Sequence, residues 1–162
     1  MKCEIFILTS LFFTITISRI YGAEIILENA DRLETERKGA LVNLFGSVVI
    51  RSGELVIKGN TASWDKNKNR VNFWGDVSLE TSEQIVKTGE LFYDGKRKEA
   101  WAKGGLVEVE SKKGDTFARG ELGFFNEKEK TAILWRNAYF SSIDTVDSGK
   151  IIVEADSFVH NS

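Results

Sequence analysis

One short motif recurs along this chain: Leu44-Phe45-Gly46-Ser47-Val48-Val49-Ile50 returns as Phe73-Trp74-Gly75-Asp76-Val77-Ser78-Leu79, and more loosely around Gly105 and Arg136. The third positions of the four copies lie about thirty residues apart, a period typical of stacked supersecondary units. Between the copies, a second element pairs a small residue with an acid or amide, as at Gly59-Asn60. The repeating unit is therefore strand, turn, strand, turn.

Hydrophobicity within these strands alternates with a period of two. Val42, Leu44, Val48 and Ile50 share one face, and polar residues separate them. Polar clusters between the strands are typical of turns, and no proline interrupts a ladder. The sequence predicts an all-β domain made of a single rolled antiparallel sheet, with little or no helix.

The glycines of the repeated motif have two interpretations. Gly46, Gly75 and Gly105 are predicted to sit at bulges where each strand turns a corner, the usual meaning of glycine inside a strand. The alternative is that they narrow a groove and let a ligand approach the backbone. The bend is favoured, because a bend at the same register in each copy would curl the stack.

The apolar column of the repeat predicts one continuous inner face. It could be a closed core, or the lining of an open gutter suited to acyl chains. The candidate lipid-binding residues on this face are Val42, Leu44, Val48, Ile50, Val71, Phe73, Val77, Leu79, Trp101, Val107, Val109, Leu134, Ala138 and Phe140.

The N-terminus resembles an export signal. Met1-Lys2 supplies a positive start, and 5–17 is an apolar run shorter than the roughly 20 residues of a spanning helix. Cleavage after Gly22 is expected, which leaves 23–162 as one exported domain; retention of the run as a membrane anchor is the alternative. Cys3 precedes the run, so it is not positioned as a lipoprotein cysteine.

Charge and composition argue against several functions. The formal net charge is −2, and no basic run with interleaved aromatics indicates a nucleic-acid partner. The single histidine is His160 and the single cysteine is Cys3, so a nucleophile dyad or a His/Cys metal site cannot be assembled. We expect no enzyme activity, no metal and no cofactor.

The succession of motifs from about Ala30 to Phe158 resembles the OstA-like domain of the lipopolysaccharide transport proteins LptA, LptC and the N-terminal part of LptD. The resemblance rests on Leu44-Phe45-Gly46-Ser47-Val48 and Phe73-Trp74-Gly75-Asp76-Val77, which are similar to the family's "F-x-G-x-V" strand, and on the small-plus-polar pairs that follow each copy. It implies a periplasmic V-shaped β-jellyroll whose hydrophobic groove holds the acyl chains of lipid A. It also implies edge-to-edge pairing with inner-membrane LptC-like and outer-membrane LptD-like proteins. Two departures are Lys103 on the apolar face and Arg136 in place of the column glycine.

Three functions follow from this pattern. The first is a soluble bridge protein that carries lipopolysaccharide, with free edges near 25–27 and 151–153 that predict head-to-tail self-association. The second is a membrane-anchored LptC-like component. The third is a stacked β-scaffold for protein or glycan contact without lipid, with Trp64, Tyr93 and Phe125 as a possible aromatic ladder.

Overall fold

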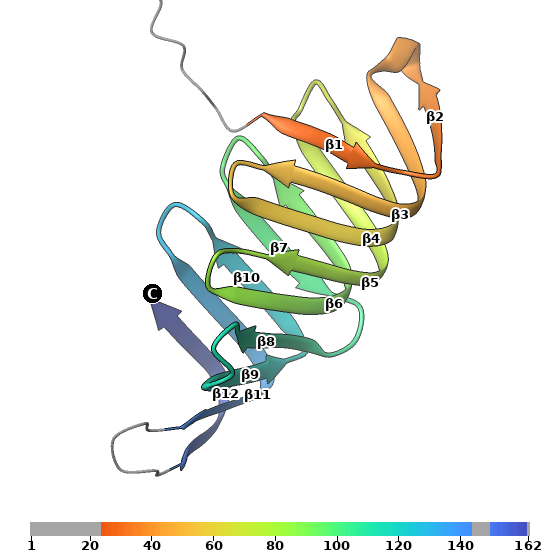
Figure 1. Cartoon of the computed structure of the whole chain (residues 1–162). Coiled ribbons are helices and arrows are strands. Elements are labelled where there is room, and N and C mark those ends of the chain that lie inside the picture. Colours follow the sequence, from red (N-terminus) through yellow and green to blue (C-terminus); the bar gives the residue numbers. More distant parts are fainter. Residues whose placement is uncertain (1–23, 144–149, 162) are drawn as a thin grey trace, which may run out of the picture.

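The computed structural model describes residues 24–143 and 150–161 as one antiparallel sheet folded into two layers (Figure 1). A one-turn 3₁₀ helix, η1 (Arg37–Gly39), joins the second and third strands. The twelve strands are β1 (Ile25–Asn29), β2 (Arg32–Glu36), β3 (Leu41–Ser52), β4 (Leu55–Asp65), β5 (Arg70–Glu80), β6 (Gln84–Asp94), β7 (Glu99–Lys103), β8 (Val107–Ser111), β9 (Thr116–Gly120), β10 (Leu122–Asn126), β11 (Thr131–Ile143) and β12 (Lys150–Asn161). The predicted all-β class is confirmed.

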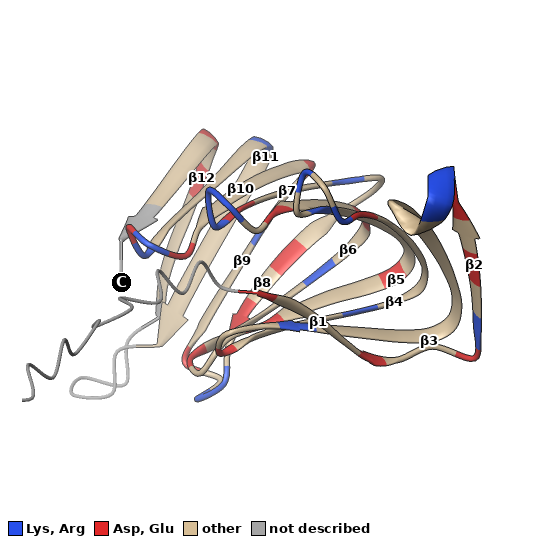
Figure 2. Ribbon diagram, turned by 90° about the horizontal axis from the view of Figure 1, so that it is seen from above, with Lys and Arg blue, Asp and Glu red and all other residues tan. Residues whose placement is uncertain are grey.

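Two layers arise because the long strands cross from one to the other. Layer 1 contains β2, β7 and β10, and layer 2 contains β1, β8 and β9. The strands β3 to β6, β11 and β12 contribute one half to each layer. Figure 2 shows β3, β4 and β5 curving around from layer 2 into layer 1. The layers therefore meet along one side, the bend edge, and face each other at the opposite side through two rows of turns.

The bend edge is built from residue pairs with positive φ. Gly46-Ser47, Gly75-Asp76, Gly104-Gly105 and Arg136-Asn137 all have φ between 46° and 122°. The ladder register shifts at the pairs within β3, β5 and β11, as a β-bulge requires. Positive φ favours glycine, which explains the glycine at the first position of three pairs. The predicted bends at Gly46 and Gly75 are confirmed.

The small-plus-polar pairs of the sequence lie against these bends. The backbone N–H of Asp31 donates to the carbonyls of Phe45 and Gly46, each at 3.0 Å. The Asn137 amide Nδ2 donates to Glu121 Oε1 at 2.6 Å in the last repeat. The glycine motif and the small-plus-polar pair of the repeat thus lie next to each other at the same bend.

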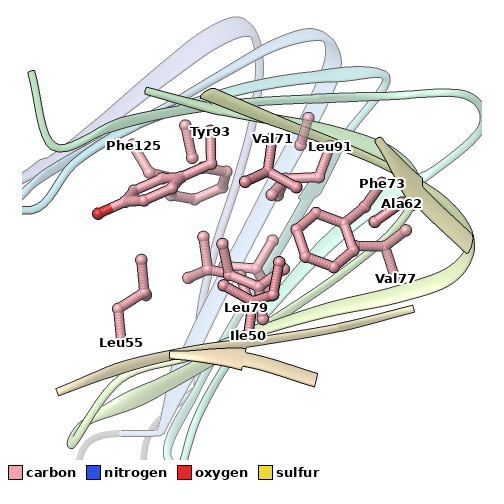
Figure 3. Packing of buried hydrophobic residues seen from close by; sticks show 14 of the residues in the cluster. Ile50, Leu55, Ala62, Val71, Phe73, Val77, Leu79, Leu91, Tyr93 and Phe125 are labelled. Atoms are coloured by element: carbon pink, nitrogen blue, oxygen red, sulfur yellow. The ribbon is translucent and has the colours of Figure 1, made fainter. Parts of the chain in front are cut away.

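Buried side chains fill the space between the layers (Figure 3). Leu44, Ile50, Val71 and Phe73 have no exposed surface. Phe73 and Val77 lie toward the bend edge, and Tyr93 lies toward the turns. The period-two pattern therefore places one continuous apolar face on the inside of the fold.

Candidate functional site

The inner face holds most of the residues predicted to bind lipid. Twelve of the fourteen are buried, and Phe140 is partly buried against them. From β3 to β6 these side chains pack into a closed core. The structure does not show an open gutter along this part of the stack.

Trp101 is an exception, and its predicted inward position is wrong. Ala100 and Ala102 face inward with 2% exposure each, whereas Trp101 is 36% exposed on the outer face. Lys103 also faces outward, and its Nζ lies 3.5 Å from Glu90 Oε2. Both errors have one cause: the corner begins at Gly104 rather than Gly105, and a slip of one residue moves every side chain of a strand to the other face.

A hydrogen bond between the layers holds the turn side closed near β3 and β6. The Tyr93 hydroxyl donates to Ser52 Oγ at 2.9 Å, and both residues are buried. Burial raises the pKa of Tyr93 to about 12, so the phenol stays protonated and can donate this hydrogen bond. Ile25 of β1, which is 3% exposed, covers the same end of the core.

The interior is more open toward the C-terminal strand. Phe140 of β11 and Phe158 of β12 stack with ring centroids 4.6 Å apart, and both remain partly exposed. Val153 pairs with Phe140 on the inner face and is 41% exposed, and Ile151, two residues before it, is 54% exposed. This end, which we call the β12 mouth, presents apolar side chains to solvent.

Two small cavities lie between the layers. One of 70 Å³ is lined by Leu55, Tyr93 and Phe125, together with the turn residues Lys98 and Lys130. A second of 30 Å³ lies beside Phe140 and Phe158 at the β12 mouth. Their combined size is far below that of an acyl chain site.

The aromatic residues considered for glycan contact do not form an outer ladder. Tyr93 has no exposed surface, Phe125 is 9% exposed, and Trp64 packs against the core. That prediction is wrong, because all three lie on the inner face. The outer face of layer 1 instead carries Phe92, Trp101 and Phe124. The ring centroid of Trp101 lies 5.4 Å from that of Phe92 and 5.3 Å from that of Phe124.

Each end of the stack presents a strand edge. Within the described residues, β1 and β2 pair only with β3, and β12 pairs only with β11. These are the positions expected from the sequence.

Across residues 24–143 and 150–161, no group of three or more His, Cys, Asp or Glu side chains is placed to hold a metal ion. In the same part of the chain, no helix has the length and apolar character to span a bilayer.

Comparison with known proteins decides the family. Residues 22–114, more than half of the chain, match the family described as OstA-like protein. The chain belongs to the OstA-like family. No curated protein matches it.

The fold of this OstA-like chain is similar to a solved structure. That structure is LptH, the LptA homologous periplasmic component of the conserved lipopolysaccharide transport device from Pseudomonas aeruginosa. The two superpose with a TM-score of 0.61 at 17% sequence identity, over 80% of this chain and 93% of LptH. The resemblance of the sequence to the OstA-like domain and its jellyroll-like fold are confirmed.

Proposed function

We propose that this protein is a periplasmic carrier of lipopolysaccharide, which holds acyl chains between its two layers and joins neighbouring OstA-like domains edge to edge. The signal over 1–22 exports it and is cleaved. The edges contact LptC-like proteins at the inner membrane and LptD-like proteins at the outer membrane. Membership of the OstA-like family and the LptH-like fold support this function.

The observation that carries the proposal is the β12 mouth. A closed apolar core would cover its own end, but Ile151 and Val153 leave about half of their surface in water on the inner face. Exposed apolar groups that continue a buried face are typical of a surface that another apolar group covers. Acyl chains enter here and extend between the layers toward Leu134, Ala138 and the other inner residues named from the sequence.

Photocrosslinking tests lipid capture at the β12 mouth. A benzophenone amino acid at Ile151 is expected to crosslink lipopolysaccharide, because this side chain lies on the inner face opposite Ser142. The same amino acid at Ile152 is the matched control: it is equally exposed, at 54%, but lies on the outer face. We expect at least a fivefold stronger lipid adduct at 151 than at 152. Equal adducts at the two positions contradict an inner lipid site.

The edges also determine how copies can join. From β1 to β12 the order in layer 2 passes through eight antiparallel pairings, so β1 and β12 run in the same direction. A head-to-tail joint between two copies therefore pairs parallel strands. Such a heterologous contact extends into a filament and leaves the apolar interior continuous from copy to copy.

Removing 148–162 tests this joint. The truncated protein loses β12 and the edge that it presents, while β3 to β6 keep their pairings. Full-length protein is expected to grow in light scattering as its concentration rises, and the truncated protein to stay monomeric with its β-sheet circular dichroism retained. If both chains scatter alike, the bridge uses another contact.

A further inference from the structure

The turns of layer 1 carry a concentration of positive charge. Four turns close the free side of this layer: 37–40, 66–69, 95–98 and 127–130. They contain nine basic residues and two acidic residues, Glu127 and Glu129. The basic residues are Arg37, Lys38, Lys66, Lys68, Lys96, Arg97, Lys98, Lys128 and Lys130. Figure 2 shows these blue segments recurring on the turns from the helical turn beside β2 to β11. We call this row the basic rim.

The opposing turns of layer 2 do not share this charge. The described turns 53–54, 81–83 and 112–115 contain two basic residues and three acidic ones. The basic residues are Lys112 and Lys113. The whole chain has a net charge of −2, yet the turns on the free side of layer 1 are strongly positive.

Backbone hydrogen bonds connect the turns of the basic rim into one ridge. The N–H of Lys66 donates to the Ala40 carbonyl at 2.9 Å, and that of Gly95 to the Asn69 carbonyl at 2.9 Å. The N–H of Glu127 donates to the Lys98 carbonyl, also at 2.9 Å. Since successive turns are two strands apart, the positive charges repeat about every 10 Å along the ridge.

Several of these cations are available to a ligand. Arg37, Lys38, Arg97 and Lys128 are exposed and form no ion pair within the described residues. Others are engaged: Lys98 Nζ, for example, lies 3.1 Å from Glu127 Oε1.

The turn 95–98 is held in place by a buried carboxylate. Asp94 Oδ1 accepts from the N–H groups of Lys96 and Arg97, at 3.0 and 3.1 Å, and Asp94 Oδ2 accepts from Arg70 Nε at 2.8 Å. Burial opposes ionisation, but these hydrogen bonds together keep the pKa of Asp94 below its usual value. The carboxylate stays charged and fixes the backbone from which the Lys96 and Arg97 side chains project.

The basic rim borders the apolar interior. Lys98 and Lys130 line the same cavity as Tyr93 and Phe125. Apolar surface between the layers, with cations along one lip, matches an amphiphile with an anionic headgroup. We propose that the basic rim binds the phosphate groups of the carried lipid, with 95–98 and 127–130 as the central contact. This assignment rests on the proposed function.

Two matched double variants test the rim. K96Q/R97Q removes two exposed charges from the basic rim, and K112Q/K113Q removes two from the opposite turns. The test compares how the wild type and both double variants capture bisphosphorylated lipid A and the same lipid after phosphatase treatment. K96Q/R97Q is expected to bind the phosphorylated lipid about tenfold more weakly at low salt, an effect that shrinks at about 1 M salt because of screening. K112Q/K113Q is expected to bind like the wild type, and the dephosphorylated lipid to bind all three proteins alike.

A soluble probe tests the rim independently of the interior. The bisphosphorylated glucosamine disaccharide without acyl chains is expected to shift the NMR signals of 95–98 and 127–130 in the wild type but not in K96Q/R97Q. If no lipid binds but the disaccharide does, the proposed function fails and the phosphate site stands. Any one of three results overturns the rim assignment. These are an equal loss of lipid A binding in both double variants, no NMR shift with the disaccharide, and preferential binding to phosphatidylglycerol vesicles over lipid A.

Discussion

Substitution of Phe73 by aspartate is expected to unfold most of the protein. The Phe73 side chain has no exposed surface and lies between the layers near the bend edge (Figure 3). An unpaired charge there costs at least several kcal/mol, against a total stability of about 5–15 kcal/mol for a domain. The variant should lose its cooperative thermal transition in circular dichroism. Lipid capture should be lost with the fold.

Val153→Asp is the matched comparison for Phe73→Asp. This side chain is on the same inner face but is 41% exposed at the β12 mouth, so its carboxylate can remain hydrated. We expect a melting temperature within a few degrees of the wild type and a clear loss of lipid crosslinking. A Phe73→Asp protein that melts normally yet captures no lipid would show that the layers already stand apart along β3 to β6.

Gly89→Ala is the second change with a large expected effect. Gly89 is the small residue of the third repeat, and a Cβ there would overlap the carbonyl oxygen of Gly104. Because the obstacle is backbone rather than a flexible side chain, β6 or the corner at Gly104-Gly105 has to move. Overpacking of this kind typically costs about 1–3 kcal/mol and sometimes more. Urea denaturation should show a lower midpoint with an unchanged slope.

Gly114→Ala separates this clash from backbone strain. Gly114 has φ of 72° but nothing within 4 Å of its Cβ position. Its substitution should cost only about 1–2 kcal/mol, the strain of a left-handed conformation. If Gly89→Ala proves no more damaging than Gly114→Ala, close contact at the bend edge is not what requires glycine.

The sequence predicted the strands and bends because both depend on local chemistry. Alternating apolar residues indicated the inner face of β3 and β5, and glycine indicated the corners at Gly46 and Gly75. In the third repeat the motif predicts the corner at Gly105, whereas the corner begins at Gly104. Gly104 corresponds to Gly75, and an additional residue, Leu106, separates this corner from Val107 of β8. The motif therefore predicts the inward positions of Val107 and Val109 correctly, but it predicts the wrong face for Trp101 and Lys103.

Whether the inner face was closed or open depended on contacts between distant strands. The Tyr93 to Ser52 hydrogen bond joins residues 41 positions apart and closes the layers near β3. Nothing local in either segment indicates it, because its geometry exists only once the layers face each other. The exposed inner residues of β12 have the same origin: β12 has no following strand, within the described residues, to cover its free edge.

By itself, the sequence determined the all-β class, the repeating unit and the identity of the two edges, since periodicity and glycine act through the backbone of each strand. Only the tertiary structure decided where charge accumulates. Basic clusters such as 66–68 and 96–98 are separated along the chain by β5, β6 and the layer-2 turn between them. In the sequence, each cluster looks like an ordinary charged turn. Folding brings every second turn to the same side, so clusters about thirty residues apart in sequence become neighbours along one ridge, opposite turns that lack the same charge.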